Sequence, residues 1–184
     1  QADGKIVVAG GGGSFAVARY TAAGALDNTF SSDGVATANV ANDGDPDYGK
    51  SVVVQTDGKI VVAGYTVKTY EVSNAKFYDF ALARFNSDGS LDTSFGSSGT
   101  LRTSMPAYGA VPGPVRVALQ ADGKIVVAGT NKGGSEDFAV GEESLDLAWK
   151  PVDGIVADPA ADESLRRMAE KWLRRDRRTH PSSC

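Results

Sequence analysis

QTDGKIVVAG, at residues 55–64, is a decamer that this chain repeats almost unchanged. It also occurs as QADGKIVVAG at residues 1–10 and again at residues 120–129. Internal repeats of this kind mark repeat architectures, in which each copy forms one structural unit and neighbouring copies bury a common core. The start positions 1, 55 and 120 are 54 and 65 residues apart. The decamer therefore predicts repeated units whose connecting loops differ in length.

Each decamer reads as part of a β-hairpin. Two β-rich runs, VVVQ and IVVAG, flank an Asp-Gly dipeptide, the strongest short hairpin signal. We expect both turn residues to adopt positive φ angles, as a two-residue turn demands. The three turns would use the pairs Asp3 and Gly4, Asp57 and Gly58, and Asp122 and Gly123. The apolar run IVVA predicts a strand covered on both faces.

A second repeated block follows the decamer, as FAVARYTAAGALDNTF at residues 15–30 and FALARFNSDGSLDTSF at residues 80–95. In its strand, Phe80, Leu82 and Arg84 should share one face, with the alternate residues on the other. Further strands are expected from Val35 to Val40 and from Leu101 to Met105. About four strands per repeat is the pattern of a β-propeller blade.

The motifs QxDGKIVVAG, FAVARY and DGSLDxSFG, taken in order, resemble the delta-60 repeat of large bacterial proteins, over residues 1–140. The resemblance implies a β-propeller-like fold. It also implies a surface-associated or secreted location, and it attaches no enzymatic role to the repeat itself. These properties are expectations carried by the family alone.

The third copy departs from the pattern, since Phe138-Ala139-Val140 runs into GEESLDLAW instead of an Ala-Arg-Tyr continuation. We expect an all-β array of antiparallel blades over residues 1–141, with units near 1–51, 52–114 and 115–141, a linker at 142–157, and a basic helix with a frayed tail at 158–184. About two and a half units fall short of the four to eight blades of a typical propeller. A fragment with open sheet edges, able to self-associate, is therefore expected.

Arginine and aspartate recur at fixed places in the second block. Arg19 and Arg84 are each followed eight residues later by an aspartate, Asp27 and Asp92. Structural pairing of each arginine with a nearby aspartate or with turn carbonyls is the favoured interpretation. An anion-binding ring at one mouth of a propeller is the alternative. The repeated aspartates of the turns are interpreted as structural, because an active site needs one asymmetric constellation.

The loop NDGDPDYG is a candidate for weak Ca²⁺ binding through Asp43, Asp45 and Asp47, which alternate like the start of a calcium loop. However, Val54 occupies the twelfth position, where such loops place a bidentate Glu. A solvated acidic loop is the preferred interpretation, and no metal site is assigned.

Two glycine-containing motifs invite a nucleotide-binding interpretation. GDPDYGKS at residues 44–51 satisfies the P-loop expression, but a strand rather than a helix should follow it, and its aspartates would repel phosphates. We interpret it as a loop between blades. The run GGGG at residues 10–13 is interpreted as a turn. No cofactor is expected.

Nucleophilic catalysis finds little support in the composition. His180 is the single histidine and Cys184 the single cysteine, and both lie at the chain's end. Metal sites built from His and Cys are excluded by number, and no apolar run reaches the length of a membrane helix. No catalytic residue is assigned.

The C-terminal segment differs in charge from the rest of the chain. Residues 164–184 hold seven Lys or Arg against two Asp or Glu, whereas the whole chain has a net charge of −4. DPAADESLRRMAEKWLRR predicts an amphipathic helix with an apolar stripe. It could cover an exposed sheet edge, or bind an anionic surface through residues 163–178. It could also be the product of a reading-frame change.

These observations favour a non-enzymatic structural or interaction module of a bacterial surface or secreted protein. Its partner would be a protein or a carbohydrate, while nucleic acid and membrane are not expected. The alternatives are a fragment of a propeller enzyme of the lyase or hydrolase type, or a weak binder of anionic surfaces through the basic helix.

Overall fold

The computed structural model describes the part of the chain that holds the repeats. It covers residues 1–41, 44–70, 75–108, 113–121, 123–131 and 137–138. The expected C-terminal helix at 158–184 lies outside these residues. Every regular element within them is a β-strand, so the predicted all-β fold is confirmed. Within the same ranges, no helix is long and apolar enough to cross a membrane.

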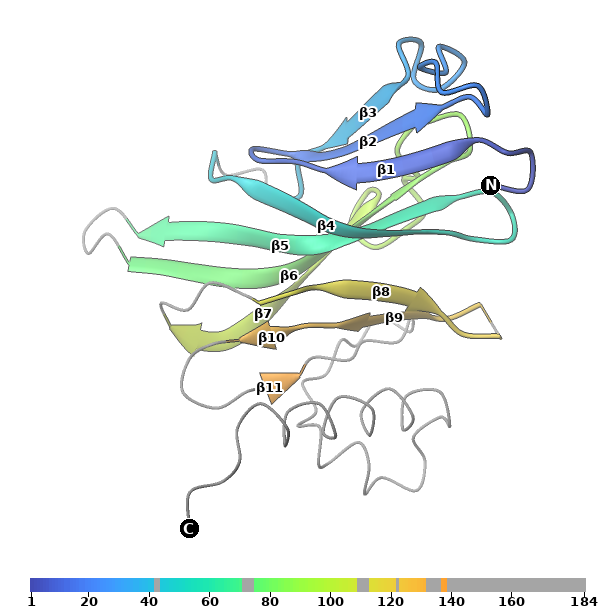
Figure 1. Ribbon diagram of the computed structural model, residues 1–184. Coiled ribbons are helices and arrows are strands. Elements are labelled where there is room, and N and C mark those ends of the chain that lie inside the picture. Colours follow the sequence, from blue (N-terminus) through green and yellow to red (C-terminus); the bar gives the residue numbers. More distant parts are fainter. Residues whose placement is uncertain (42–43, 71–74, 109–112, 122, 132–136, 139–184) are drawn as a thin grey trace, which may run out of the picture.

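The strands form three successive units, which follow one another from the top to the bottom of Figure 1. Unit 1 contains β1 (Ile6–Gly10), β2 (Phe15–Tyr20) and β3 (Val35–Ala38). Unit 2 contains β4 (Asp47–Val54), β5 (Ile60–Tyr70), β6 (Ala75–Phe85) and β7 (Thr100–Tyr108). Unit 3 contains β8 (Arg116–Leu119) and β9 (Ile125–Ala128), accompanied by the short pair β10 (Thr130–Asn131) and β11 (Asp137–Phe138).

All strand pairs are antiparallel and follow the chain order within each sheet. The strands of the first two decamers, β1 and β5, pair with the following strand in the same register. Ile6 pairs with Tyr20 in unit 1, and Ile60 pairs with Phe85 in unit 2. In unit 2 the decamer strand β5 has a second neighbour, because β4 pairs with its other edge. In unit 1, β1 is the end strand of its sheet.

The hairpin turns differ from the predicted two-residue turn. Gly58 has a φ of +84°, while Asp57 is not among the residues with positive φ. Gly58 N–H donates to the Gln55 carbonyl at 2.9 Å and Gln55 N–H donates to the Lys59 carbonyl at 2.8 Å. This pattern is the longer hairpin loop, in which a type I turn ends in a left-handed glycine that forms a bulge. Only the glycine therefore needs the left-handed conformation.

Alternation along β6 divides the core into two layers. Phe80 and Leu82 belong to a cluster between units 2 and 3, while Ala81, Ala83 and Phe85 belong to a cluster between units 1 and 2. The IVVA run of β5 is fully buried on both faces, as predicted, and Ile125 to Val127 of β9 are at most 2% exposed. The first copy differs, because Ile6 and Val8 are 51% and 49% exposed.

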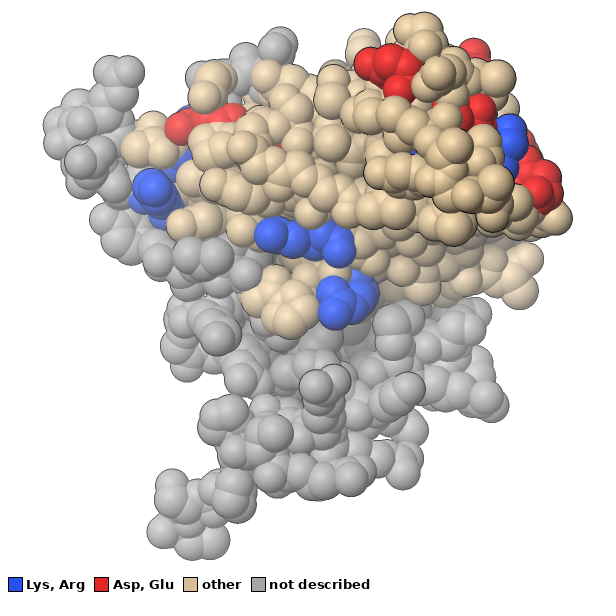
Figure 2. All heavy atoms as spheres, turned by 45° about the horizontal axis from the view of Figure 1, so that its top comes forward, with Lys and Arg blue, Asp and Glu red and all other residues tan. Residues whose placement is uncertain are grey.

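Stacking of unit 1 on unit 2 explains why the decamer strand is buried in unit 2 and half exposed in unit 1. Phe15, Val17 and Phe30 of unit 1 are fully buried and pack against Ile60 and Val62 of unit 2. In Figure 2, the end of the stack that carries unit 1 is turned toward the viewer, and its surface is mostly uncharged, with acidic side chains toward its ends. The core thus lies between successive sheets, and one face of the first sheet lies outside it.

Candidate functional site

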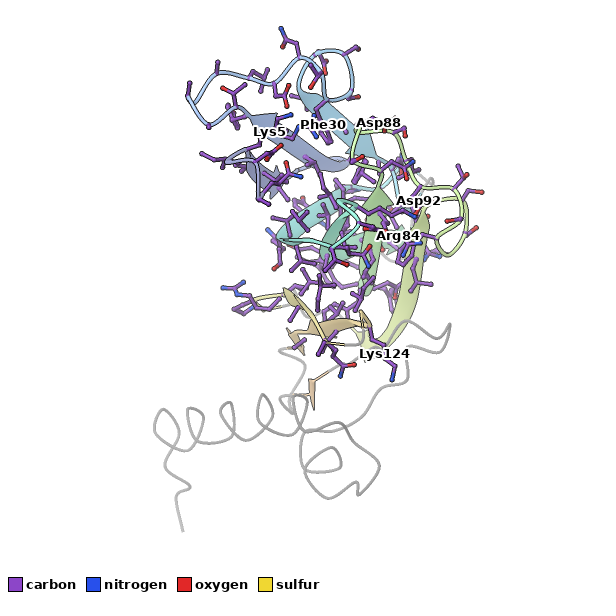
Figure 3. The ribbon with its side chains drawn as sticks, turned by 90° about the vertical axis from the view of Figure 1, so that its right-hand side faces the viewer. Lys5, Phe30, Arg84, Asp88, Asp92 and Lys124 are labelled. Carbon is purple, nitrogen blue, oxygen red and sulfur yellow. The ribbon has the colours of Figure 1, made fainter. Side chains whose placement is uncertain are left out.

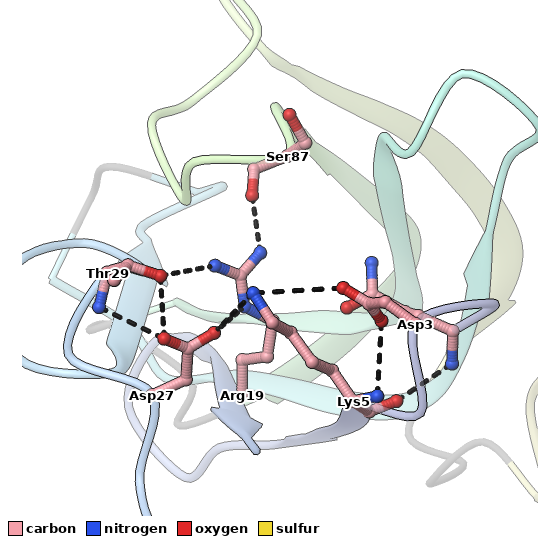
Figure 4. A network of polar contacts seen from close by, with 7 residues as sticks. Asp3, Lys5, Arg19, Asp27, Thr29 and Ser87 are labelled. Carbon is pink, nitrogen blue, oxygen red and sulfur yellow. Dashed lines mark hydrogen bonds and ion pairs between the residues drawn. The ribbon is translucent and has the colours of Figure 1, made fainter. Parts of the chain in front are cut away.

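A buried ion-pair network occupies the turn side of unit 1. Arg19, on β2, donates from Nε to Oδ2 of Asp27 at 2.7 Å, and the Lys5 ammonium lies 3.1 Å from the same oxygen. The other carboxylate oxygen accepts hydrogen bonds from the hydroxyl of Thr29 at 2.6 Å and from its N–H at 3.1 Å. Figure 4 shows these groups around the carboxylate. Asp27 is 5% exposed, so its charge is compensated inside the protein.

The same network recurs in unit 2 with the same spacing. Arg84 donates from Nε to Oδ2 of Asp92 at 2.8 Å, and the Lys59 ammonium lies 2.8 Å from that oxygen. The hydroxyl of Ser94 donates to Oδ1 at 2.7 Å, which is the place of Thr29 in unit 1. Figure 3 labels Lys5 in unit 1, Asp92 and Arg84 close together in unit 2, and Lys124 below them. We name these two groups the unit 1 network and the unit 2 network.

Each arginine of the two networks also stacks on a buried phenylalanine. The guanidinium carbon of Arg19 lies 4.6 Å from the ring centroid of Phe30, and that of Arg84 lies 4.5 Å from the centroid of Phe95. Phe30 is fully buried and Phe95 is 3% exposed. A guanidinium held between a carboxylate and an aromatic face is fixed in orientation. The arginine therefore joins the polar network to the hydrophobic core of its unit.

The network in unit 1 extends to the next unit. Arg19 donates from Nη1 to the Ser87 carbonyl at 2.5 Å, and the N–H of Ser31 donates to the Asp88 carbonyl at 2.8 Å. Both acceptors lie in the β6–β7 connection of unit 2. Gly89 of that turn approaches Ser31 so closely that an added Cβ would lie 2.8 Å from the Ser31 nitrogen. The arginine thus serves the junction between units as well as its own unit.

Hydrogen bonding strongly shifts the acidity of both carboxylates. Hydrogen bonds hold the pKa of Asp27 well below its usual range, and the one from the Thr29 hydroxyl has the largest effect. Lys5, the Thr29 N–H and Arg19 also lower this pKa, whereas burial raises it. The pKa of Asp92 is lowered in the same way, by Lys59, by the hydroxyl and N–H of Ser94, and by Arg84. A general base works best with a pKa near the working pH. Both carboxylates are therefore poor proton acceptors near neutral pH.

The geometry also bears on the alternative of an anion-binding ring. Arg19 uses Nε, Nη1 and Nη2 for Asp27, Ser87 and Thr29, and its side chain is 7% exposed. Binding an external anion would require breaking these contacts and uncovering the guanidinium. The observed arrangement therefore supports the pairing interpretation.

The turn aspartates accept hydrogen bonds within their own turns. Oδ1 of Asp3 accepts from Lys5 N–H and Oδ1 of Asp57 accepts from Lys59 N–H, each at 3.1 Å. The glycines that follow them, Gly4 and Gly58, have φ angles of +78° and +84°, and Gly123 has +88°. Asp122 lies outside the described residues. These turns also place Lys5 and Lys59 beside the network carboxylates.

Two of the three calcium-candidate aspartates bind backbone amides instead of facing a common centre. Oδ2 of Asp45 accepts from Thr69 N–H at 2.7 Å, and Oδ2 of Asp47 accepts from Val40 N–H at 2.6 Å. Asp43 lies outside the described residues. In the described part of the chain, no group of three or more His, Cys, Asp or Glu could hold a metal ion.

The P-loop-like segment is not wholly a loop, contrary to the prediction. Asp47 to Ser51 form the first part of β4, because Asp47 pairs with Thr66 and the strand continues to Val54. A bulge lies between Gly49 and Ser51. The glycine run after β1 returns the chain to β2, and Gly13 exchanges backbone hydrogen bonds with Asp47 at 3.1 and 3.2 Å. A strand cannot supply the helix N-terminus that phosphate binding requires.

Sequence reasoning missed the lysines and hydroxyl residues of the two networks. A usable signal exists for both, because lysine follows Asp-Gly in each decamer and Thr29 and Ser94 stand at the same place. It also missed a cluster of tyrosines in unit 2. The rings of Tyr48 and Tyr65 lie 5.1 Å apart, those of Tyr65 and Tyr78 lie 5.9 Å apart, and burial, with the neighbouring tyrosines, raises the pKa of Tyr65.

Comparison with protein families gives one match. The family model described as domain of unknown function DUF5122, a beta-propeller, matches residues 1–30, 55–95 and 120–140, which together make up half of the chain. The matched segments contain the three decamers, both arginine–aspartate pairs and their phenylalanines. No curated protein matches the chain.

Proposed function

The chain belongs to the DUF5122 beta-propeller family, and on that premise we propose that it is a non-enzymatic structural or interaction module. The observation that carries this proposal is the repetition of the ion-pair network. Asp27 and Asp92 have the same kinds of partner at nearly the same distances in two successive units. A catalytic group would be expected once, in an asymmetric setting.

Local energetics support a scaffolding role for the same residues. Each network contains a carboxylate at most 7% exposed, compensated by two cations and capped by a hydroxyl. Groups that satisfy one another in this way fix a single arrangement of strand, turn and aromatic core. Their polar atoms are committed to one another, which leaves other parts of the surface for recognition.

The location in this proposal is taken from the resemblance to the delta-60 repeat, a finer family assignment that we include in the proposal. The module then belongs to a bacterial surface or secreted protein and binds a protein or a carbohydrate. The whole chain has a net charge of −4, although its C-terminal segment is basic. The acidic remainder is poorly suited to binding nucleic acid or anionic lipid.

The test of the proposal separates binding from bond cleavage. The purified chain would be incubated with xylan, pectin, alginate and peptidoglycan, while co-sedimentation reports binding and released reducing ends report cleavage. The expected result is no release above the blank, whether or not one of the polymers binds. Release that scales with protein concentration and that co-elutes with the protein in gel filtration would overturn the proposal.

Location is tested separately on intact bacteria that produce the protein. Protease added outside the cells should remove an epitope placed within the repeat region, or the epitope should be found in the medium. A protected cytoplasmic epitope would contradict the surface or secreted assignment.

A further inference from the structure

A lysine ammonium lies over two tyrosine rings at the start of β4 in unit 2. The Nζ atom of Lys50 lies 5.3 Å from the ring centroid of Tyr48 and 5.4 Å from that of Tyr65. The centroids of the two rings are 5.1 Å apart, and their planes are inclined by 31°. Lys50 is exposed and Tyr48 is half-buried, whereas Tyr65 is 7% exposed. We call these three residues the tyrosine–lysine site.

The backbone of β4 has a bulge at Lys50. The register of β4 against β5 passes from Gly49 directly to Ser51, so Lys50 is the extra residue between two paired ones. Such an extra residue bends its strand and redirects a side chain, and bulges are frequent next to functional sites. The N–H of Val117 in unit 3 donates to Oγ of Ser51 at 3.1 Å. The bulge is thus held in place from the neighbouring unit.

The charge of Lys50 is not balanced by a carboxylate in the part of the chain that the structure describes. Lys5 and Lys59 lie 3.1 and 2.8 Å from network carboxylates. Lys50 takes part in none of the ion pairs of the described ranges. Its contacts with the two rings are weak at an exposed position and leave the charge accessible to an anion. Arg116, on the adjacent strand β8, is also exposed, and its guanidinium donates to the Val115 carbonyl at 2.9 Å.

The tyrosine–lysine site is specific to unit 2, unlike the two ion-pair networks. Aligned on the decamer, the third copy has different residue types at all three positions, namely Gly113, Val115 and Thr130. The first copy has Gly11 at the place of Tyr65. A feature that the scaffold needs recurs from unit to unit, as the networks do. A feature confined to one unit is therefore better suited to recognition than to holding the fold together.

The strands that carry the site are longer than the corresponding strands of unit 1. β5 and β6 have eleven residues each, whereas β1 and β2 have five and six. Their pairing continues from Tyr65 with Phe80 to Tyr70 with Ala75. The extension also contributes Tyr78, whose ring centroid lies 5.9 Å from that of Tyr65. In repeat proteins, insertions in single repeats map to one face, which is often the binding face.

The groups of the site suit a sugar acid. An ammonium and a carboxylate form a charge-assisted hydrogen bond, and the phenol group of a tyrosine can both donate to and accept from sugar hydroxyls. A nucleobase would need an open aromatic face for stacking, but Lys50 lies over both rings. The net charge of −4 disfavours a densely charged polyanion. A polymer with isolated carboxylates avoids this repulsion.

We propose that the tyrosine–lysine site binds the uronate side groups of a sparsely charged polysaccharide. The uronate carboxylate pairs with the Lys50 ammonium, and its hydroxyls bond to the phenol group of Tyr48. Tyr65 and the bulge hold the lysine in position. This inference rests on the proposed function and deepens it, because it names the class of carbohydrate and the residues that recognise it.

The test compares two forms of one polymer. Glucuronoxylan carries isolated glucuronate groups on a neutral backbone, and chemical reduction of its carboxyl groups removes the charge but keeps the sugars. Affinity electrophoresis of the full chain in gels that contain either form measures binding. We expect retardation by glucuronoxylan and at least about tenfold weaker retardation by the reduced form. No retardation by glucuronoxylan, or equal retardation by both forms, would overturn the proposal.

Substitution of Lys50 locates the binding. Lys50→Met removes the ammonium while keeping most of the side-chain length, and it should weaken binding by about tenfold. Lys50→Arg should retain most of the binding, since a guanidinium also pairs with a carboxylate. The matched control is Lys76→Met, because Lys76 is exposed, lies on β6 and carries the same charge. Equal weakening in Lys50→Met and Lys76→Met would show unspecific attraction and overturn the site.

Substitution of Tyr48 tests the second contact. Tyr48→Phe keeps the ring under Lys50 and removes only the hydroxyl, so the thermal midpoint should stay the same while glucuronoxylan binds more weakly. Unchanged binding by this variant would contradict the assigned role of the phenol group.

Two further polyanions identify other occupants. Poly-thymidylate and polyglutamate carry phosphates or carboxylates without a sugar acid. Tighter retardation by either one, lost in Lys50→Met, would assign the site to nucleic acid or to an acidic protein and overturn the proposal. Cleavage of glucuronoxylan would refute the proposed function but leave its Lys50-dependent binding in place. Absence of both binding and cleavage would overturn this inference alone, so the two failures are distinguishable.

Discussion

At the scale of single residues, the network carboxylates illustrate what the sequence does and does not reveal. The eight-residue spacing in both copies predicts that Arg19 pairs with Asp27 and Arg84 with Asp92, and the structure brings each pair together. The spacing does not reveal the lysines, because Lys5 and Lys59 reach the carboxylates through the hairpin turns of the preceding strands. The spacing of residues along the sequence does not predict contacts that depend on how two hairpins pack together.

The first prediction concerns Asp92. Replacement by Asn leaves the Arg84 and Lys59 cations close together without a counter-charge, so Asp92→Asn should lower the free energy of unfolding by about 3 kcal/mol at pH 7, near the low end for a broken buried pair because Lys59 is 29% exposed. Urea unfolding followed by circular dichroism measures the change. Asp57→Asn is the control, since Asp57 is exposed and Asn can still accept the Lys59 N–H. Equal losses in the two variants would refute the structural role of the network.

The lowered pKa values of Asp27 and Asp92 predict a direction for pH dependence. Because the folded pKa lies below the unfolded value of about 4, the unfolded state binds protons first as the pH falls. The two ionised carboxylates stabilise the folded state fully above about pH 5, and this stabilisation is lost progressively below about pH 4. Urea midpoints between pH 7 and pH 2.5 should show this decline, and it should be weaker in the double variant Asp27→Asn, Asp92→Asn. A decline of the same size in the double variant would contradict the assignment.

At the scale of elements, the hairpin turn shows how a correct prediction can contain a wrong detail. Asp-Gly correctly predicts a turn between two strands, and the strands near Val35 and Leu101 also form. The turn type was wrong, since it depends on which residues pair beside the turn, here Gln55 with Lys59. The pairing of Tyr48 with Tyr65 was also out of reach, because the bulge between Gly49 and Ser51 shifts the register of β4.

The corrected turn predicts a specific cost for one glycine. Gly58 has a φ of +84°, so Gly58→Ala should destabilise the protein by about 1 kcal/mol. Gly10→Ala is the matched control. An added Cβ at Gly10 meets nothing within 4 Å and its φ is outside the left-handed region, so the change should be neutral or slightly stabilising. Thermal unfolding of both variants measures the difference, and a neutral Gly58→Ala would contradict the turn geometry.

At the scale of the whole molecule, the repeat period predicts a stack of equivalent sheets, and the structure has one. It does not predict that equivalent residues have different environments. Ile60 and Val62 are fully buried, whereas Ile6 and Val8, in an identical local sequence, are half exposed. The difference arises because unit 1 covers the face of β5 that carries Ile60 and Val62. The face of β1 that carries Ile6 and Val8 lies outside the core. Burial in a stacked array is set by the neighbouring unit, because each unit contributes only one side of every interface.

Hydrogen exchange at the repeated decamer tests this central claim most directly. Residues 4–10 and 58–64 have the same sequence, GKIVVAG, so their intrinsic exchange rates are closely matched and any difference reports the folded environment. We predict that the amides of Ile60 and Val62, which pair with β6 and are covered by unit 1, exchange much more slowly than those of Ile6 and Val8, which pair with β2 in the same register. Equal protection in the two copies would contradict the account that stacking of units, and not the decamer itself, determines which strand is buried.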